Sequence, residues 1–473
     1  MGLARELAVR ITALNYDDLP EEAIHWGKVA ILDTIGVALA GAFEDGPRIL
    51  DEVLGLPASG PSLVFGTARR ASPLDAALVN GTAAHALDFD NTAASLGGHV
   101  AAVMVPAMIA AGDAGQSSGR DLLLAHAAGY ETGRIGYGLN PEHSEKGWHP
   151  TSTLGVFAVT AACARLLGLT AEQTEIALGL ATSLAAGTKA NFGTMTKPLH
   201  AGQCARAGLL AAMLAKKGFT ANPDAFEHKQ GFLKLFSADG DYDVARMLEN
   251  WGKPLDSVSP GASYKLYPCC YSTHSAVEAA RNLVRQHGRL DPAQIERVDS
   301  QTSARALAHT DRAQPRSPLE AKFSVQYCVA RALIHGEVVM DHFEGDAFRA
   351  PVAQALLSKV HASPYAGPFY DDAERFDARL KVVLKDGRVL EASVDRPLGR
   401  AADNAIPAED LKAKFRDCAT RVLAPDAADA VCRSVWALET LGSVRELTAM
   451  LEATRLDRPA TTPRQHCEAA VTA

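Results

Sequence analysis

The sequence predicts a mainly α-helical protein with an α+β part, in which both chain ends form a large all-helical domain and a smaller α+β domain forms a lid. The 473 residues are 47% hydrophobic but only 6% aromatic, and this composition favours closely packed helices over an aromatic-rich β-sandwich. Apolar helical patterns fill the first 220 residues and return after about residue 400, whereas the segment between them contains alternating, strand-like patterns.

Helix signals mark the N-terminal half of the chain. Ser72 followed by Pro73 indicates a helix start, with the serine as N-cap and the proline in the first turn. Thr170 and Gln173 have the spacing of a capping box, and Gly168 before them is typical of the residue that follows a helix. These signals predict a helix on either side of residues 168–170 and another that begins at Pro73.

Strand signals follow after about residue 265. Residues 294–303 have the alternating pattern of a strand, and residues 380–394 form two such runs joined at Asp386-Gly387, a strong hairpin signal. Residues 319–336 predict an amphipathic helix, and residues 408–423 predict a return to helical structure.

These patterns predict the domain boundaries. We expect residues 1–265 together with 400–473 to form the helical domain and residues 266–399 to form the α+β lid domain, with 457–473 as a loose tail. Such an insertion creates a cleft between two domains, which is a common place for a small-molecule site.

The charge balance excludes several classes of partner. The chain has 47 basic and 55 acidic residues, a net charge of −8, so it has no general attraction for nucleic acid or anionic lipid. Its eight cysteines contain no CxxC pair, which argues against a disulfide framework and a zinc ribbon. Charges interrupt the N-terminal apolar run too often for a secretion signal. We expect a cytoplasmic protein, and residues 91–112, rich in Ala and Gly, to be a buried helix rather than a membrane span.

A first candidate site surrounds Asp88. If the helix that begins at Pro73 continues, His85, Asp88 and Thr92 share one face. A histidine, a carboxylate and a hydroxyl are costly to bury on an apolar helix without a purpose. The alternative is that the next residues simply turn the chain and that Asp88 satisfies local backbone donors.

A second candidate site is a basic segment. Residues 187–217 contain five basic residues and no acid, which suggests a small anionic ligand in an otherwise acidic chain. Lys197, between Thr196 and Pro198, is on a stiff backbone that suits a catalytic or carboxylate-pairing ammonium group. The alternative is a solvated loop. Upstream, the helix start at His149 could be capped by its own Ser and Thr or could hold a carboxylate. The sequence has no GxxxxGK[ST] motif, so nucleotide binding is not supported.

A third candidate site includes two adjacent cysteines. Cys269 and Cys270 shortly before His274 could indicate a metal site or a nucleophilic Cys–His pair. Adjacent cysteines rarely both bind one tetrahedral ion, so we expect them to be small packing residues and His274 to be an acid or base. No metal site is expected.

These motifs together resemble the MmgE/PrpD family, whose members include 2-methylcitrate dehydratase, cis-aconitate decarboxylase and iminodisuccinate epimerase. The resemblance is carried by ILDTIGVALAG, NGTAAHALDFDNT, GWHPTSTLGVFAVTAACARLLGLT, NFGTMTKPLHAGQCARAG, KLYPCCYSTHSAVEAA and LEAKFSVQYCVARALIHGEV. It covers nearly the whole chain and is specific for the family, but not for one reaction. It implies a helical domain with an α+β lid, a homodimer, and cofactor-free chemistry on small di- or tricarboxylates.

The resemblance also implies functional residues. We expect catalytic roles for Asp88, His99, Lys197 and His274. We expect substrate-binding roles for Thr92, His149, Thr196, Lys265 and Tyr267. One departure from the family pattern is Asn91, where many members have an aspartate.

The expected function is a cofactor-free lyase, most simply a dehydratase of a 2-methylcitrate-like hydroxy acid. In this scheme Lys197 and Lys265 pair with substrate carboxylates, and His274 or His99 removes a proton next to a carboxylate. Asp88 tunes its partner histidine. The alternatives are an epimerase of an iminodisuccinate-like dicarboxylate, a cis-aconitate-type decarboxylase, and a non-catalytic polycarboxylate-binding protein. The absence of a tyrosine in residues 142–146 disfavours the epimerase.

Overall fold

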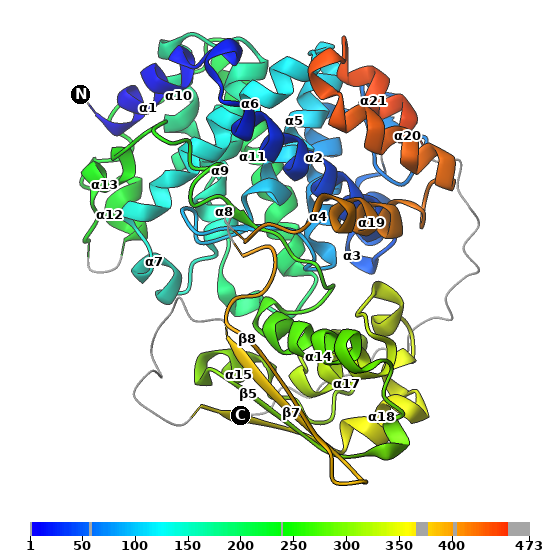
Figure 1. Cartoon of the computed structure of the whole chain (residues 1–473). Helices are drawn as coiled ribbons and strands as arrows, with labels where there is room; N and C mark the ends of the chain where they lie inside the picture. Colours follow the sequence, from blue (N-terminus) through cyan, green and yellow to red (C-terminus); the bar gives the residue numbers. More distant parts are fainter. Residues whose placement is uncertain (1, 56–58, 238–239, 366–376, 401–403, 453–473) are drawn as a thin grey trace.

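The computed structural model describes residues 2–55, 59–237, 240–365, 377–400 and 404–452. Figure 1 shows a large body of helices above a smaller body that contains the main sheet. The predicted fold class, mainly helical with an α+β part, is confirmed. The predicted loose tail at 457–473 lies outside the described residues.

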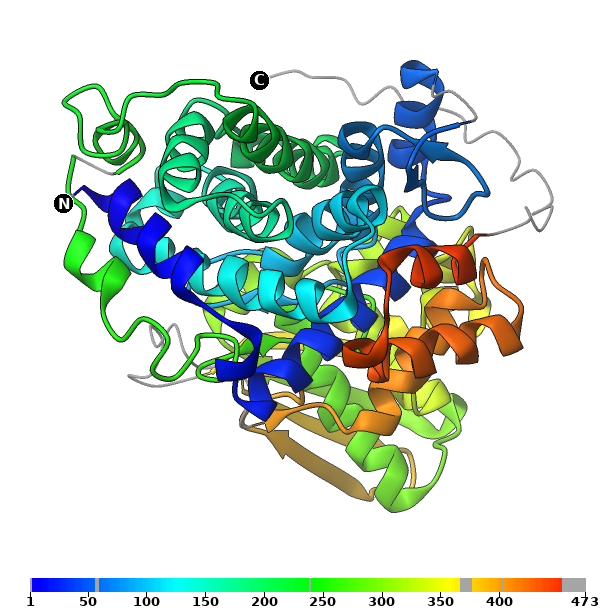
Figure 2. The same cartoon turned by 90° about the horizontal axis from the view of Figure 1, so that it is seen from above.

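Two separate cores divide the chain. The larger core takes buried side chains from Leu3 to Tyr264 and again from Ile406 to Leu451, so helices from both chain ends pack together. Figure 2 shows the orange and red C-terminal helices beside the blue N-terminal ones. The second core takes its buried side chains from Tyr267 to Val394, and we refer to this part of the chain as the lid.

The larger core is built around the apolar helix α5 (Val100–Gly115), whose residues 100–113 are all buried. Helices α2 (Glu21–Gly41), α4 (Pro73–Ala86), α6 (Gly119–Thr132), α9 (Gly155–Leu166) and α11 (Thr196–Lys216) pack against it. Among the described residues, α2 has the length and hydropathy of a membrane span, but 78% of its apolar window is buried inside the protein. The apolar surface of α2 is therefore buried in the protein core.

The remaining helices of the larger body surround this centre. They are α1 (Leu3–Ala13), α3 (Asp45–Leu54), α7 (Glu142–Glu145), α8 (Pro150–Thr153), α10 (Ala171–Thr182), α12 (Phe232–Phe236), α13 (Val244–Leu248), α19 (Ala408–Ala419), α20 (Pro425–Trp436) and α21 (Val444–Met450). Short antiparallel pairs join β1 (Ser62–Leu63) to β2 (Arg70–Ala71) and β3 (Thr92–Ala93) to β4 (Ala262–Ser263).

The predicted helix ends are confirmed. The hydroxyl of Ser72 accepts a hydrogen bond from the backbone N–H of Asp75 at 3.2 Å, and Thr170 and Gln173 form a reciprocal capping box. The helix that begins after His149 is α8, and neither α8 nor α9 after it has a side-chain cap, so the capping alternative is not supported. Ser152 instead donates to the carbonyl of Ala186, which ties this segment to the loop before α11.

Two glycines allow α4 and α11 to approach closely. A Cβ atom on Gly81 would lie 2.9 Å from the Cα of Gly202, and a Cβ on Gly202 would lie 2.2 Å from the carbonyl oxygen of Leu78. Any larger residue would force the helices apart. This contact brings the C-terminal end of α4 beside the N-terminal end of α11, where the candidate residues Asp88 and Lys197 lie.

The lid is a four-stranded mixed sheet covered by helices. The strand order is β6 (Val360–Pro364), β5 (Ile295–Thr302), β7 (Ala378–Leu384) and β8 (Val389–Val394), with β5 and β6 parallel and the other pairs antiparallel. The predicted strand and the predicted hairpin at Asp386-Gly387 are both confirmed, and Gly387 supplies the positive φ of 86° that the turn requires.

The lid helices are α14 (His274–His287), α15 (Ala304–Thr310), α16 (Pro318–Lys322), α17 (Val325–His335) and α18 (Pro351–Leu357). Helix α14 packs on β7 and β8 and against α17. The single helix predicted for residues 319–336 is instead divided into α16 and α17. Ser324 causes the division, because its hydroxyl accepts from the N–H of Tyr327 at 3.1 Å and so begins a new helix.

Candidate active site

The candidate site begins where α4 ends. The helix stops at Ala86, and Asp88 has a left-handed backbone with a φ of 53°. The expectation that His85, Asp88 and Thr92 share one helix face is therefore wrong. The chain turns instead at Leu87, Asp88 and Phe89, and Thr92 lies in β3, paired with Ser263 of β4. The turn separates the side chains of Asp88 and Asp90, which have different partners.

Asp88 is paired with two lysines. Its Oδ1 lies 2.7 Å from the Nζ of Lys197, and its Oδ2 lies 3.1 Å from the Nζ of Lys265. Burial alone would raise the pKa of Asp88, but the two ammonium groups outweigh it and hold the pKa well below 3.8. Asp88 is therefore an ionised carboxylate that positions two cations.

Asp90 is the carboxylate that contacts the histidines. Its two oxygens lie 3.0 and 3.1 Å from Nδ1 of His85, and Oδ2 lies 2.8 Å from Nδ1 of His99. Burial would raise the pKa of Asp90, but the two imidazoles hold it well below 3.8. An ionised carboxylate only accepts hydrogen bonds, so it favours the Nδ1–H form of both rings and leaves each Nε2 as a base.

The two histidines differ in their access to solvent. The side chain of His85 is completely buried, whereas that of His99 is 13% exposed. Burial lowers the pKa of His85 to about 4, so this ring is neutral at pH 7. The ring centroids lie 4.5 Å apart. His99 is therefore the member of the pair that can reach a ligand.

The same three residues have the composition of a metal site. One ligand atom from each of His85, Asp90 and His99 lies within 4.8 Å of the others. The carboxylate oxygens lie 2.8 to 3.1 Å from the two Nδ1 atoms, which is the distance of a direct contact between the side chains. The ionised carboxylate therefore holds the two imidazoles through direct His–Asp contacts.

His149 extends the histidine cluster. Its ring lies 6.0 Å from that of His85, and its Nδ1 lies 3.1 Å from Nδ1 of His200 on α11. Burial lowers the pKa of His149 well below 6.5. The ring of Phe192 covers it edge-on at 4.8 Å. His149 is therefore a neutral, oriented imidazole beside the basic segment.

Lys197 lies on a helix rather than on the predicted loop. It is in the first turn of α11, which begins at Thr196. Pro198 is tolerated in this first turn because its missing N–H needs no helical partner there. The Lys197 ammonium lies 5.2 Å from the centre of the Phe192 ring. The N–H of Thr196 donates to the hydroxyl of Thr194 at 3.2 Å.

In the segment after β4, Lys265 contacts the candidate site, whereas Tyr267 and His274 pack in the lid. Lys265 points to Asp88 and also donates to its carbonyl oxygen. Cys270 is close to both groups: burial raises the pKa of Cys270, Asp88 raises it further, and Lys265 lowers it. Tyr267 and His274 are buried in the lid, where their rings lie 5.0 Å apart.

His274 makes its contacts within the lid. Its Nε2 lies 3.4 Å from the carbonyl oxygen of Cys269, and its ring stacks on Tyr271 at 4.7 Å. The hydroxyl of Tyr267 accepts from Arg281 at 2.6 Å. The structure thus brings together Asp88, His99, Lys197, Lys265 and His149, with Thr92 and Thr196 at the flanks, and gives His274 and Tyr267 partners in the lid.

Comparison with known proteins identifies the family. Residues 5–245 match the MmgE/PrpD N-terminal domain, and residues 267–439 match the MmgE/PrpD C-terminal domain. The chain belongs to the MmgE/PrpD family. The cis-aconitate decarboxylase of Homo sapiens is 30% identical over 95% of both chains. The cis-aconitate decarboxylase-like protein oryM of Aspergillus oryzae is 29% identical over 95% of this chain and 97% of its own. The mitochondrial 2-methylcitrate dehydratase of Yarrowia lipolytica is 25% identical over 51% of this chain and 48% of its own.

Several residues of this MmgE/PrpD site were not selected from the sequence. The sequence indicates His85 as part of the polar group around Asp88, but only the contacts in the structure identify Asp90 as the partner of the histidines. Lys322 of α16 donates to the carbonyl of Leu87 at 3.2 Å, and Lys414 of α19 donates to that of Phe89 at 2.9 Å. No local signal marks these two lysines, because each reaches the site from a distant helix.

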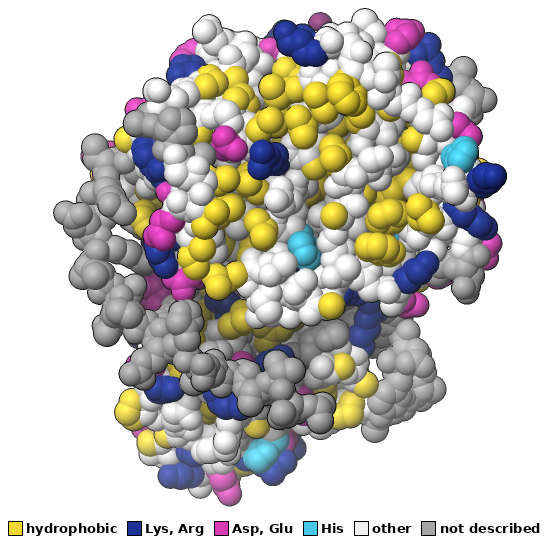
Figure 3. Space-filling model, turned by 180° about the vertical axis from the view of Figure 1, so that it is seen from behind, with side chains coloured by type: hydrophobic (Ala, Val, Ile, Leu, Met, Phe, Trp, Pro, Cys, Tyr) yellow, Lys and Arg dark blue, Asp and Glu magenta, His cyan; other side chains and the backbone are white. Residues whose placement is uncertain are grey.

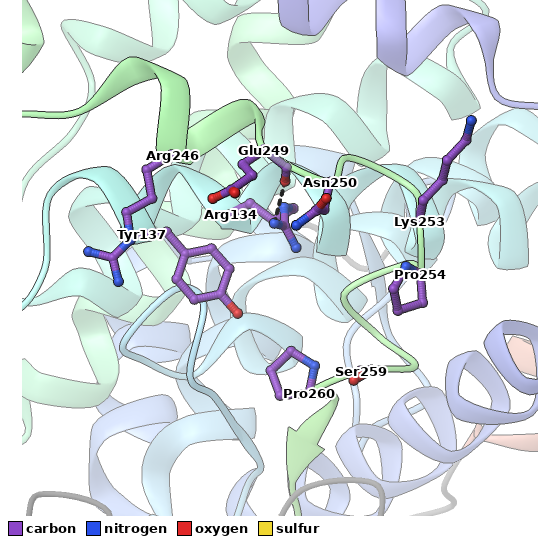
Figure 4. A pocket seen from close by; sticks show the side chains of 9 residues that line it. All are labelled: Arg134, Tyr137, Arg246, Glu249, Asn250, Lys253, Pro254, Ser259 and Pro260. Atoms are coloured by element: carbon purple, nitrogen blue, oxygen red, sulfur yellow. Dashed lines mark hydrogen bonds between the residues drawn. The ribbon is translucent and has the colours of Figure 1, made fainter.

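A buried ion-pair cluster supports the strand that leads to Lys265. Arg134 Nη1 lies 2.9 Å from Oδ1 of Asp256, and Glu131 accepts from the N–H groups of Gly252 and Asp256 at 2.8 and 2.7 Å. Figure 4 shows Arg134 at the back of a cavity of about 300 Å³, bonded to the carbonyl of Glu249. This cluster fixes the loop before β4 and hence the position of Lys265.

Proposed function

We propose that this MmgE/PrpD protein is a carboxy-lyase that decarboxylates a tricarboxylate of the cis-aconitate type. Relatives named cis-aconitate decarboxylase align over 95% of the chain, whereas the relative named 2-methylcitrate dehydratase aligns over 51%. The comparisons therefore favour the decarboxylase alternative over the dehydratase that was first expected.

The observation that carries the proposal is the pairing of one carboxylate with two ammonium groups. The carboxylate oxygens of Asp88 form ion pairs with the Nζ atoms of Lys197 and Lys265 at 2.7 and 3.1 Å. Each ammonium has three donors. Lys197, whose side chain is 17% exposed, keeps donors for a substrate carboxylate, and Lys265, which contacts both the carboxylate and the carbonyl of Asp88, keeps one. A site with two oriented cations suits a small polycarboxylate better than a neutral ligand.

The proposed reaction needs one proton and one departing carboxylate. The bond to the carboxylate on the saturated arm breaks, CO₂ leaves, and its electron pair forms a new carbon–carbon double bond. The old double bond shifts its electrons to the carbon next to another carboxylate, which takes up a proton. Negative charge develops on that carboxylate, where an ammonium stabilises it.

His99 is the proposed proton donor. Its Nδ1 faces Asp90 at 2.8 Å, and its side chain is 13% exposed, so Nε2 is the ring nitrogen that can face a ligand. The Asp90 carboxylate stabilises the imidazolium that carries the proton before transfer. Buried His85, which is neutral, keeps the shared carboxylate in position.

The test uses the purified protein with cis-aconitate, citrate, 2-methylcitrate and iminodisuccinate in deuterated buffer. The proposal expects CO₂ release from cis-aconitate and a dicarboxylate product that carries one deuterium, seen by proton NMR. Water loss from citrate or 2-methylcitrate without CO₂ would identify a dehydratase instead. Deuterium exchange in iminodisuccinate without bond cleavage would identify an epimerase, and binding without conversion would identify a non-catalytic protein.

We also propose that the protein forms a homodimer. Figure 3 shows hydrophobic side chains in broad patches on the rear face of the helical body, and patches of this kind mark subunit contacts in many proteins. Light scattering after size-exclusion chromatography tests this directly, because a mass near 50 kDa would indicate a monomer and contradict the proposal.

A further inference from the structure

Three lysines hold the carbonyl oxygens of three consecutive residues in the turn that carries Asp88. Lys322 donates to Leu87 at 3.2 Å, and Lys414 donates to Phe89 at 2.9 Å. Lys265 donates to the carbonyl of Asp88 itself. The lysines come from α16 in the lid, from α19 near the C-terminus, and from the segment after β4. The backbone of the turn is therefore fixed by three separate parts of the chain.

Lys322 differs from the other two lysines in its charge environment. Lys414 lies 2.6 Å from Oδ1 of Asp33, and Lys265 lies 3.1 Å from Oδ2 of Asp88. Within the described part of the chain, no carboxylate lies at ion-pair distance from Lys322, although Glu44 and Asp88 act on it from further away. Burial lowers the pKa of Lys322. Lys322 is half-buried, and an ammonium group that is partly withdrawn from water without a paired carboxylate is costly, so its position needs an explanation.

The backbone of Lys322 connects it to the lid side of the site. Its carbonyl accepts from the N–H of Cys270 at 2.9 Å, and the preceding residue, Ala321, is part of the lid core. One residue thus joins the lid, the double-cysteine segment and the Asp88 turn.

Other contacts across the same seam support this arrangement. Met340 of the lid packs with Leu87 and Phe89 of the turn in a small shared cluster. Arg421, after α19, pairs with Asp341 and Glu344 of the lid. The lid therefore rests directly on the turn, and Lys322 supplies its polar contact with the turn backbone.

We propose that Lys322 is a positioning residue that couples the seating of the lid to the orientation of Asp88. A left-handed residue such as Asp88, with a φ of 53°, persists only when its surroundings hold it. Removing the Lys322 contact frees the Leu87 carbonyl and loosens the turn. The Asp88 carboxylate then no longer holds Lys197 and Lys265 in the arrangement that the reaction needs.

The inference rests on the proposed function for its kinetic readout, and Lys322→Met is the variant that tests it. We expect kcat to fall by about tenfold or more, equivalent to at least about 1.4 kcal/mol. KM should rise by a smaller factor than kcat falls, because Lys197 and Lys265 keep their charges and still attract the substrate carboxylates. Lys322→Arg, which keeps a cation and donors, should restore part of kcat.

Lys359→Met is a matched control. Lys359 is also a lid lysine that donates to backbone carbonyls, those of Pro292 and Ile295, but both lie within the lid. This variant should keep the wild-type kcat. Equal losses in both variants would show a general effect on lid stability and would overturn the proposal.

A second readout does not depend on activity. Hydrogen–deuterium exchange of the peptide that covers residues 84–93 should be faster in Lys322→Met than in wild type, with residues 3–13 unchanged. Unchanged exchange and kcat would overturn the proposal. A rise in KM with unchanged kcat would also overturn it, by showing that Lys322 binds a substrate carboxylate. If wild-type protein converts no cis-aconitate, the proposed function fails, and the exchange measurement still decides the role of Lys322.

Discussion

Oδ2 of Asp90 lies 2.8 Å from Nδ1 of His99, although Asp88 is the carboxylate that was expected from the sequence to tune a histidine. The same carboxylate holds His85 at 3.0 Å. Asp90 is thus the residue that sets the tautomer of both imidazoles, while Asp88 positions cations.

The first prediction concerns this contact. Asp90→Asn presents either an amide N–H or a neutral oxygen to the rings, so the imidazolium form of His99 loses its stabilising charge. We expect kcat for cis-aconitate to fall by about 10²–10⁴-fold with little change in KM. Asp113→Asn is the control, because Asp113 is equally buried but pairs with Arg70 and Arg445. An Asp90→Asn enzyme with wild-type kcat would rule out the proton-transfer role.

The second prediction compares two histidines. His99→Asn should lower kcat by about 10²-fold or more, as expected for the loss of a general acid. His274→Asn should lower kcat by less than about tenfold, because His274 contacts lid residues. Steady-state kinetics on both variants, after circular dichroism has established that each is folded, makes the comparison. A folded His274→Asn protein without activity would place this histidine in the catalytic machinery.

The third prediction concerns the buried pair formed by Lys414 and Asp33. Nζ and Oδ1 lie 2.6 Å apart, and both side chains are almost fully buried. Lys414→Met leaves the Asp33 charge unpaired and should lower the free energy of unfolding by about 3–5 kcal/mol. Urea denaturation measures the change. The double variant Lys414→Met/Asp33→Leu should be more stable than the single one, and additive losses would contradict the pairing.

The fourth prediction concerns pH and Glu131. Burial raises the pKa of this carboxyl from 4.5 to about 7, so the folded protein keeps a proton that the unfolded chain has lost between these values. Unfolding therefore releases this proton. Because proton release is favoured at higher pH, the contribution of Glu131 to stability falls as pH rises from 4.5 to about 7.

Glu131→Gln removes this contribution. Over the same pH range the free energy of unfolding of the variant should rise relative to that of wild type, by about 3 kcal/mol in total. Denaturant curves at several pH values measure this difference. Both proteins contain the same buried histidines, so the effect of histidine titration cancels when the two curves are subtracted. A constant offset between the two proteins at all pH values would contradict the raised pKa.

Much of the fold could be predicted because its signals are local. Ser72 caps α4, Thr170 caps α10, and Asp386-Gly387 forms the hairpin turn, each through neighbours in the sequence. The division of the predicted 319–336 helix was missed because the apolar pattern continues through Ser324, whose capping bond interrupts the helix. The end of α4 at Ala86 could not be predicted from neighbouring residues, because the lysines that hold the turn at residues 87–89 lie far away in the chain.

The sequence by itself determined the fold class, the family and the set of polar residues from which the site is built, because composition, caps and motifs are properties of contiguous residues. Only the tertiary structure decided which residues meet. Asp90 rather than Asp88 contacts His99, and Lys322 reaches the Leu87 carbonyl across 235 residues of sequence. The physical reason is that ion pairs and hydrogen bonds depend on distances of about 3 Å. The packing of α4 on α11, and of the lid on the helical domain, sets those distances.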